Sequence, residues 1–491
     1  MAQTVAVKER YSVVIGLEVH SQLLTKSKMF CGCSADYASD PPNTHVCPVC
    51  LGLPGSLPVI NRQAIDFTIM TGLALNCEVG GLTRFDRKNY FYPDLMKDYQ
   101  ISQYDQPIAT NGWLDVEVGG ERRRIGIRRV HLEEDTARLA HREGARGQRY
   151  SLVDVNRAGT PLMEIVSDPD IATPEEARAY LVKLRQILVY LGVSTGSMEE
   201  GSFRCDANVS IRPAGQQELG SKVEVKNMNS FRAVYRALEH EVERQAAVLD
   251  AGGRIPQETR GWDDERGATV SQRSKEFAHD YRYFPEPDLP PLVLTADRVE
   301  GVRGRLAELP EARRTRFRTQ YGLSEYDSGV LTADSGAADY FEAVVASLGK
   351  PESAKTAANW LVNDLFGRLN AGARPLAEVK VTPEGLSELI RLVEDGTISQ
   401  RAAKEVFAEM FESGRPAGAI VAERGLTQIS DDAALESAVD QALAANSKSV
   451  ADYRAGRQQA LGYLVGQVMR LTRGKANPAV VNQLILRKLT E

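Results

Sequence analysis

Acidic and basic residues alternate with apolar ones along two neighbouring segments in the middle of the chain. Between residues 203 and 213, Arg204, Asp206 and Asn208 occupy alternate positions, and Glu224 and Lys226 do the same in the segment after a turn. Because alternate residues of a strand share a face, this pattern predicts a hairpin with an apolar underside and a charged upper face. Such a face can be exposed to solvent and carry weak cross-strand ion pairs. Alternatively, it can form the floor of a site for a metal ion and phosphates.

Two further extended segments carry an imidazole close to a carboxylate. In residues 11–22, Glu18 and His20 fall on one face of the predicted strand. A lone histidine is more often structural, but a carboxylate two residues away can reach the same cation. In residues 125–135, Glu133 aligns with the other polar residues of its strand, whereas Glu134 joins them only if the strand ends or bulges there.

Four cysteines form two close pairs near the amino terminus, Cys31 with Cys33 and Cys47 with Cys50. Together they offer the four thiolates that structural zinc prefers, and a closed shell of four ligands leaves no open position for chemistry. The pattern predicts a zinc knuckle, and the alternative is four unligated thiols. Two further cysteines are predicted to be small core residues: Cys77 and Cys205.

Aromatic rings are interleaved with cations between residues 84 and 106, among them Lys88, Tyr90, Phe91, Tyr92 and Tyr104. Such rings can stack nucleic-acid bases while the neighbouring cations contact phosphates. The same composition suits the tyrosine-rich edge of a domain, and the sequence leaves both interpretations open.

The composition is that of an ordinary protein of two or three domains, with 491 residues, 43% of them hydrophobic and 26% charged. The formal charge of -6 means that a nucleic-acid partner has to be met by a local basic surface. No apolar run approaches the roughly 18 residues of a membrane helix, and the amino terminus lacks a secretory signal. We therefore expect a cytoplasmic protein with no membrane partner.

The predicted fold is α+β, with three domains. Strand patterns with interspersed helices indicate a mainly antiparallel-sheet domain over residues 1–292, which contains the predicted zinc knuckle at 31–50. Residues 257–284 add polar candidates, including Lys275 and His279, before a proline-rich break at 285–291.

Helical periodicity then predicts an all-α helical domain over 293–414 and a small all-α tail domain over 415–491. Residues 441–491 carry eight Lys or Arg against two Asp or Glu. This basic surface suits a phosphate backbone, although a merely solvated helical face has the same composition.

The familiar nucleotide-binding and hydrolase motifs are absent. The sequence has no P-loop, no Rossmann glycine fingerprint, no kinase signature set, no nucleophile elbow and no serine-rich amidase segment. If the protein uses ATP, it has to hold it with carboxylates, a metal ion and basic side chains from several strands. It has no evident means of releasing ammonia from an amide.

Several motifs together closely resemble the B subunits (GatB) of the bacterial aspartyl/glutamyl-tRNA amidotransferases, and they run from end to end of the chain. They are the two cysteine pairs and residues 14–22, 131–135, 154–164, 204–210, 224–230, 280–288 and 477–481. Several long motifs in the right order are far more specific than any one of them.

The resemblance implies a ligase that works as a heterotrimer with an amidase (glutaminase) subunit and a third, small subunit. The present chain would use ATP and Mg²⁺ to phosphorylate the side-chain carboxylate of Glu or Asp misacylated on tRNA(Gln) or tRNA(Asn). Ammonia released from glutamine by the amidase subunit would then displace the phosphate. The resemblance further implies that residues 1–292 form a cradle domain that holds the kinase site, that the tail contacts tRNA and that the cysteine pairs hold structural Zn²⁺.

Carried onto this sequence, the resemblance implies catalytic Mg²⁺ ligands at a set of acidic residues and one histidine: Glu18, His20, Glu133 or Glu134, Asp206 and Glu224. Imidazole is an uncommon ligand for magnesium, so His20 is expected to act through water or to mark a second metal. On parity and charge alone, Lys88, Arg204 and Lys226 are expected to contact phosphates. The competing hypothesis is a non-enzymatic tRNA-binding scaffold whose acidic cluster only supports the structure.

Overall fold

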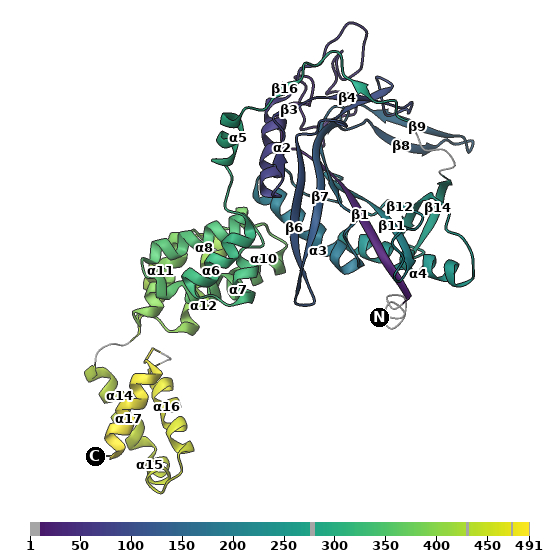
Figure 1. Cartoon of the computed structure of the whole chain (residues 1–491). Helices are drawn as coiled ribbons and strands as arrows, with labels where there is room; N and C mark the ends of the chain where they lie inside the picture. Colours follow the sequence, from purple (N-terminus) through teal and green to yellow (C-terminus); the bar gives the residue numbers. More distant parts are fainter. Residues whose placement is uncertain (1–9, 275–279, 429–431, 473–474, 491) are drawn as a thin grey trace. The chain divides into compact units, whose positions relative to one another are not determined.

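The computed structural model describes residues 10–274, 280–428, 432–472 and 475–490. The chain divides into two compact units, Met1–Pro310 and Glu311–Glu491. The first contains the sheets and the second is helical (Figure 1). The predicted α+β fold class is thus confirmed. The sequence candidates Lys275 and His279 lie outside the described residues.

A nine-stranded sheet organises the first unit, in the order β14-β13-β12-β11-β1-β10-β7-β6-β2. Neighbouring strands are antiparallel except β12 and β13, which are parallel. The strands are β1 (Tyr11–Gln22), β2 (Glu78–Val79), β6 (Ala109–Val118), β7 (Glu121–Glu134), β10 (Pro161–Ser167), β11 (Phe203–Pro213), β12 (Val223–Lys226), β13 (Glu258–Asp263) and β14 (Ala268–Ser274).

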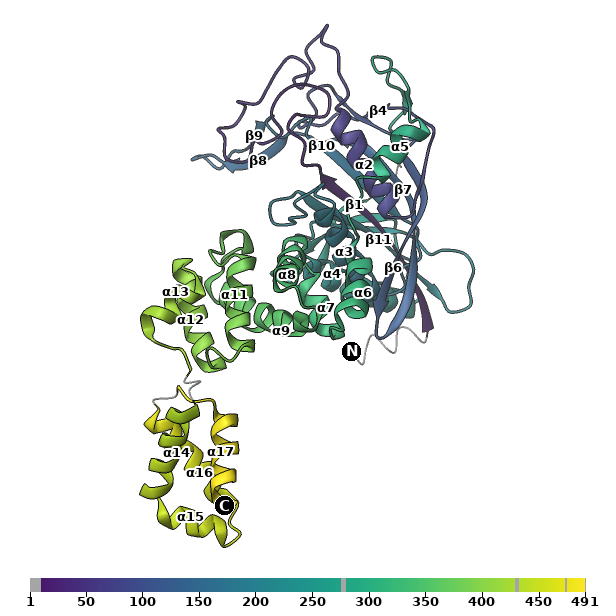
Figure 2. The same cartoon turned by 90° about the vertical axis from the view of Figure 1, so that its left-hand side faces the viewer.

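Helices cover the apolar face of this sheet. Ile15, Leu17 and Val19 of β1 are buried in the same core as residues of the covering helices. Figures 1 and 2 both place α3 and α4 against the sheet. The helices of this unit are α2 (Arg62–Ala74), α3 (Pro174–Tyr190), α4 (Phe231–Asp250) and α5 (Ala296–Arg303). Because one face of β1 is committed to the core, its alternate residues must face the other side.

The start of α3 follows directly from its sequence. The Thr173 side chain accepts a hydrogen bond from the Glu176 backbone amide, and Pro174 occupies the first helical turn. Glu176 in turn accepts from the Ala172 amide at 2.8 Å. This pair of reciprocal bonds satisfies amides that would otherwise lack partners, and it fixes the point at which the chain turns from β10 onto the apolar face.

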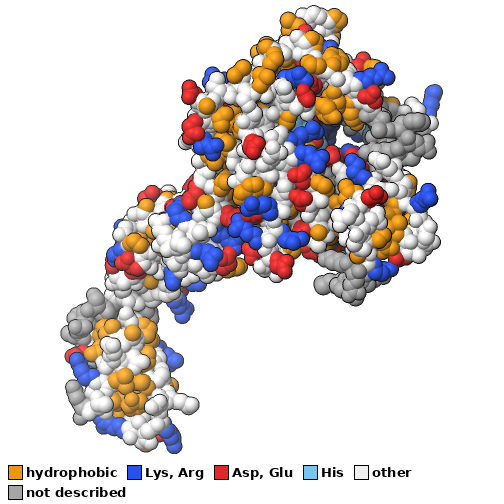
Figure 3. All heavy atoms as spheres, in the orientation of Figure 1, with side chains coloured by type: hydrophobic (Ala, Val, Ile, Leu, Met, Phe, Trp, Pro, Cys, Tyr) orange, Lys and Arg blue, Asp and Glu red, His pale blue; other side chains and the backbone are white. Residues whose placement is uncertain are grey.

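The first unit also contains three small sheets. A three-stranded sheet has the order β15-β4-β5, and the other two are the pairs β16-β3 and β8-β9. Their strands are β3 (Leu82–Thr83), β4 (Asp86–Asn89), β5 (Tyr99–Ser102), β8 (Arg138–Glu143), β9 (Arg149–Asp154), β15 (Phe284–Pro285) and β16 (Leu292–Val293). Figure 3 shows the mouth of a hollow in this unit, edged by Lys and Arg side chains.

The second unit is built from helices: α6 (Pro310–Tyr321), α7 (Glu325–Leu331), α8 (Ser335–Leu348), η1 (Pro351–Ser353), α9 (Ala354–Asn359), the π-helical η2 (Trp360–Leu365), α10 (Phe366–Gly372), η3 (Leu376–Glu378), α11 (Pro383–Glu394), α12 (Gln400–Ser413), α13 (Ala417–Arg424), α14 (Asp432–Ala445), α15 (Ser447–Arg454), α16 (Gln459–Leu471) and α17 (Pro478–Thr490). None of the described helices is long and apolar enough to cross a membrane.

Buried apolar residues of the second unit form two separate clusters. One extends from Phe317 to Val421 and the other from Leu435 to Leu489. The first compact unit ends at Pro310, and Val302 belongs to its core. The three-domain division at residues 292 and 414 therefore stays a prediction, and these cores suggest boundaries somewhat later in the chain.

Candidate active site

Strand register brings residues that are far apart in the sequence onto one face of the large sheet. His20 of β1 lies opposite Arg204 of β11 on one side and opposite Glu164 of β10 on the other. Glu164 in turn lies opposite His131 of β7. Cross-strand partners in a sheet point to the same face, so the polar residues of four adjacent strands meet there.

The centre of this face is the inner cluster, which we define as His20, Glu133 and Glu164. The His20 Nε2 atom lies 3.6 Å from Glu133 Oε1 and 3.5 Å from Glu164 Oε2. One ligand atom from each of the three side chains lies within 4.8 Å of the others. Glu133 is 2% exposed and Glu164 is 8% exposed. Two buried carboxylates beside an imidazole can hold a divalent cation.

Charge within the inner cluster is balanced by protonation. Burial lowers the pKa of His20, but Glu164, Glu133 and Asp206 outweigh that effect and raise it to about 9. Burial raises the pKa of Glu164, whereas His131 and His20 outweigh it and hold that pKa well below its usual range. The imidazolium therefore supplies positive charge at the point where a divalent cation would supply it.

The other predicted acidic residues form a neighbouring outer group around Lys226. The Lys226 Nζ atom lies 2.5 Å from Asp206 Oδ2 and 3.3 Å from Glu224 Oε1. Glu224 also accepts a hydrogen bond from the Thr259 hydroxyl, at 2.8 Å. Burial lowers the pKa of Lys226, but these two carboxylates outweigh it and raise it. Lys226 thus forms ion pairs with both Asp206 and Glu224 and offsets their negative charge.

Glu18 completes the outer group. It lies opposite Asp206 in the β1–β11 register, and its Oε1 atom accepts a hydrogen bond from Asn208 Nδ2 at 2.8 Å. The predicted metal ligands are therefore divided between two adjacent places. His20 and Glu133 lie in the inner cluster, whereas Glu18, Asp206 and Glu224 lie beside it.

Glu134 lies elsewhere, because consecutive residues of a strand point to opposite faces. Its Oε1 atom is 2.6 Å from Lys97 Nζ and accepts a hydrogen bond from the Ile101 amide at 3.0 Å. It lines a cavity of about 220 Å³ together with Cys31 and Cys50. Of the two glutamates that the sequence left open, Glu133 is the one in the inner cluster.

Two of the predicted phosphate ligands flank the inner cluster. Burial lowers the pKa of Lys88, but Glu133 and Glu164 contribute to raising it above its usual range. Burial also lowers the pKa of Arg204, while Asp135 raises it, with smaller contributions from Glu133 and Asp206. Arg204 Nη2 lies 2.9 Å from Asp135 Oδ2. Both side chains therefore remain cationic next to buried carboxylates.

The sequence reasoning missed Glu164 and His131 as site residues. The His131 Nε2 atom lies 3.2 Å from Glu164 Oε2. Glu164 is the only charged residue in the strand Pro161–Ser167, which is largely apolar. A single carboxylate in a buried strand is a usable signal, because burying a charge is costly unless a partner offsets it.

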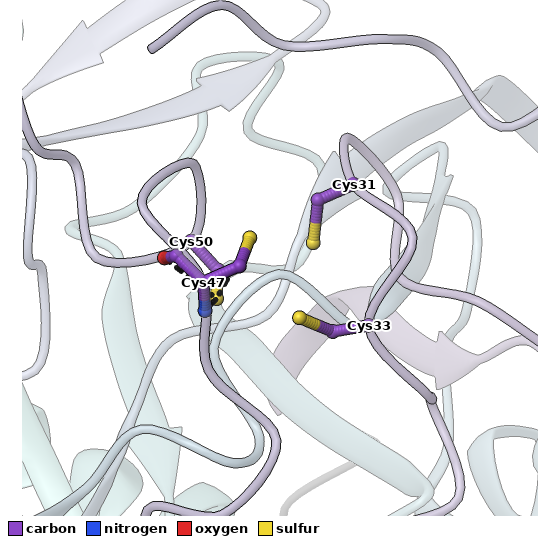
Figure 4. A group of neighbouring side chains, drawn as sticks. All are labelled: Cys31, Cys33, Cys47 and Cys50. Atoms are coloured by element: carbon purple, nitrogen blue, oxygen red, sulfur yellow. Dashed lines mark hydrogen bonds between the residues drawn. The ribbon is translucent and has the colours of Figure 1, made fainter.

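The four cysteines of the predicted knuckle converge from two loops (Figure 4). Their Sγ atoms lie within 4.8 Å of one another, and those of Cys47 and Cys50 are 3.9 Å apart. Tetrahedral zinc with Zn–S bonds of about 2.3 Å requires sulfur separations of about 3.8 Å. The Cys47 backbone amide also donates to Cys50 Sγ at 3.1 Å. We call these four residues the cysteine knuckle.

A buried lysine beside the cysteine knuckle shows that its surroundings fit a bound zinc ion. Lys28 is 0% exposed, and its Nζ atom donates to the carbonyl oxygens of His45 and Val155 at 2.8 and 3.2 Å. Four thiolates around Zn²⁺ carry a net charge of about -2, which a buried ammonium offsets.

The same surroundings favour a thiolate. A hydrogen bond with Cys31, the Cys47 backbone and Lys28 outweigh burial and lower the pKa of Cys50 to about 4. Cys77 and Cys205, by contrast, are buried in the main core, as predicted.

Comparison with known proteins assigns the chain to a class. The GatB/GatE catalytic domain family matches residues 13–300, and the GatB domain family matches residues 339–489. The first unit thus contains a GatB/GatE-type catalytic domain, and a GatB domain follows it.

Curated relatives define the family more narrowly. Proteins named as the B subunit of aspartyl/glutamyl-tRNA(Asn/Gln) amidotransferase are 56% identical in Dehalococcoides mccartyi, 57% in Thermomicrobium roseum and 57% in Moorella thermoacetica. Each alignment covers at least 97% of this chain and 98% of the relative. The chain belongs to this family of amidotransferase B subunits, which confirms the resemblance seen in the sequence motifs.

Proposed function

We propose that this chain activates the side-chain carboxylate of Glu or Asp misacylated on tRNA(Gln) or tRNA(Asn) and then forms the amide. The observation that carries the proposal is the convergence of His20, Glu133 and Glu164 from three strands, flanked by Lys88 and Arg204. The names of the relatives, which specify aspartyl/glutamyl-tRNA(Asn/Gln) amidotransferase, support the choice of substrate.

The chemistry begins with a poor electrophile. A carboxylate at neutral pH does not react with ammonia, so its oxygen first takes the terminal phosphoryl group of ATP, giving an acyl phosphate and ADP. Ammonia then attacks the acyl carbon, inorganic phosphate leaves, and a proton is lost from nitrogen. Phosphoryl transfer depends mainly on alignment and charge neutralisation.

The residues of this face fit those requirements. His20, Glu133 and Glu164 would hold Mg²⁺, with Glu18, Asp206 and Glu224 beside them as further ligands or as ligands of a second ion. Mg²⁺ held there would neutralise the negative charge of the phosphates. Lys88, Arg204 and Lys226 would orient the phosphates, since all three cations are held close to the carboxylates.

Partners and structural zinc complete the proposal. Because the described residues contain no recognisable glutaminase site, ammonia would come from an amidase subunit in a cytoplasmic heterotrimer that also contains a third, small subunit. The cysteine knuckle would hold structural Zn²⁺. The basic tail would contact the tRNA backbone, and Figure 3 shows Lys and Arg side chains bordering an apolar band on the C-terminal helices.

Glu133→Gln in the assembled complex tests the proposal. The amide keeps the shape of the side chain but removes its charge, so we expect amidated tRNA to fall about 100-fold or more while glutamine hydrolysis persists. Glu117→Gln, at an exposed position on β6, is the matched control. Each charged tRNA, Glu-tRNA(Gln) and Asp-tRNA(Asn), is assayed separately. Undiminished amide formation by Glu133→Gln would favour the scaffold hypothesis.

A further inference from the structure

Four tyrosines form a ring cluster beside the inner cluster, defined as Tyr90, Tyr104, Tyr281 and Tyr283. The rings of Tyr104 and Tyr283 are stacked, with centroids 4.3 Å apart and planes within 11°. Tyr281 meets Tyr283 edge-on at 6.0 Å and Tyr90 at 5.8 Å. Tyr104 nevertheless remains 53% exposed, so the stack ends on a ring that is open to solvent.

Backbone contacts fix the position of these rings. The Tyr104 amide donates a hydrogen bond to Asp86 Oδ2 at 3.0 Å, and Asp86 is buried in β4. The Asn89 amide donates to the Tyr281 carbonyl oxygen at 2.9 Å. The segments that carry Tyr104 and Tyr281 are therefore both anchored to β4, and the ring stack is preorganised.

Arg129 is a cation next to this stack. Its guanidinium carbon lies 5.9 Å from the centroid of the Tyr104 ring. Its Nε atom is buried without a hydrogen-bond partner, and no carboxylate of the described residues forms an ion pair with it. Arg129 as a whole is half-buried, and a buried N–H without an acceptor is costly, so a ligand anion is a natural partner at this position.

The ring cluster borders the inner cluster. Arg129 precedes His131 by two residues on β7, so both face the polar side of the sheet. Lys88 Nζ lies 5.0 Å from the Tyr281 ring centroid. Burial raises the pKa of Tyr283 to about 12, and Glu133 and Glu164 add to that effect. A nucleotide held at the rings would thus have its phosphates or ribose close to the carboxylates.

We propose that Tyr104, Tyr283 and Arg129 form a nucleoside subsite, in which a base continues the ring stack and Arg129 contacts the adjoining phosphate. The inference deepens the proposed function and rests on it for the identity of the ligands. A tyrosine-rich domain edge alone requires neither an exposed stacking ring nor a buried guanidinium N–H that lacks an acceptor among the described residues. The ligand chemistry is an adenine ring with a phosphate, which both ATP and the 3′-terminal adenosine of tRNA provide.

Equilibrium binding to the assembled complex tests the subsite without requiring turnover. The probes are ATP, an uncharged tRNA(Gln) and the same tRNA without its terminal adenosine. Base stacking contributes enough that Tyr104→Leu should weaken binding of one probe about 5- to 100-fold. Tyr104→Phe keeps the ring and should bind like the wild type. Arg129→Met should weaken the same probe, independently of the aromatic substitution.

The probes distinguish the two sources of the base. Weaker binding of ATP alone assigns the subsite to the nucleotide. Loss of the difference between complete and truncated tRNA assigns it to the tRNA 3′ end. If Tyr104→Leu and Arg129→Met both bind all probes like the wild type, with unchanged melting temperatures, the subsite is disproved. Amide formation that still depends on Glu133 would then leave the proposed function standing.

Discussion

The inner cluster and the cysteine knuckle are both groups of potential metal ligands in the first unit, but they are assembled in opposite ways. The knuckle draws its four sulfur atoms from two short loops within residues 31–50. The inner cluster draws one side chain from each of β1, β7 and β10, and these side chains lie at positions 20, 133 and 164 of the sequence. Local spacing suffices for the first, whereas the second depends on the register of a whole sheet.

The surroundings of the cysteine knuckle and of the inner cluster also differ. The knuckle is a closed set of four thiols with a buried ammonium, Lys28, alongside. The inner cluster has oxygen and nitrogen ligands and is flanked by Lys88 and Arg204, which can meet external anions. A closed set of four thiolates suits a structural ion, while carboxylates and an imidazole beside cations suit phosphate chemistry. Substitutions in the two groups should therefore have separable effects.

The largest expected effect is the loss of amidation in Glu164→Gln. Because Glu164 and Glu133 contribute to one cluster, amide formation should fall about 100-fold or more, and the double variant with Glu133→Gln should be hardly worse than either single variant. Rates of amidated-tRNA formation measure this, with zinc content as the control that should not change. Losses that multiply in the double variant would show that the two carboxylates act independently.

A smaller effect, confined to the cysteine knuckle, is expected for Lys28→Met. Removing a neighbouring charge should weaken zinc binding about 10-fold, as judged by competition with a chelator, whereas Cys47→Ser should abolish the site. Lys26→Met is the matched control, since Lys26 is an exposed lysine two residues away. Zinc affinity that is the same in Lys28→Met and Lys26→Met would contradict the proposed role of the buried ammonium.

The smallest expected effect is on the stability of the second unit, and it concerns Glu342, a carboxylate that is paired with two arginines. Burial raises the pKa of Glu342, but Arg316 and Arg313 outweigh it and lower it to about 2. Because this pKa is depressed by folding, the stabilisation is complete above about pH 4.5 and is lost as the pH falls toward 2. Urea unfolding of wild type and Glu342→Gln should therefore converge in stability over this range. A difference that stays constant with pH would exclude the ion pairs as its cause.

The sequence was most informative where alternation or spacing is local. The hairpin of β11 and β12, the polar face of β1 and the cysteine pairs all follow from patterns within about twenty residues. The choice between Glu133 and Glu134 could not be made in this way, because both are charged and they are adjacent in the sequence. Only the face of the sheet to which each side chain points distinguishes them. Glu164 was overlooked because its partners are on other strands.

By itself, the sequence determined the fold class, the family and the residue types available for phosphate and metal chemistry. Periodicity and motif order are properties of neighbouring positions, so they can be read without coordinates. The tertiary structure alone decided that His20, Glu133 and Glu164 form one cluster and that Glu134 points away from it. It also decided that Arg129 lies beside a tyrosine stack with a buried Nε atom that has no hydrogen-bond partner among the described residues. These outcomes depend on which strands pair and in what register, and that is set by the packing of the whole core.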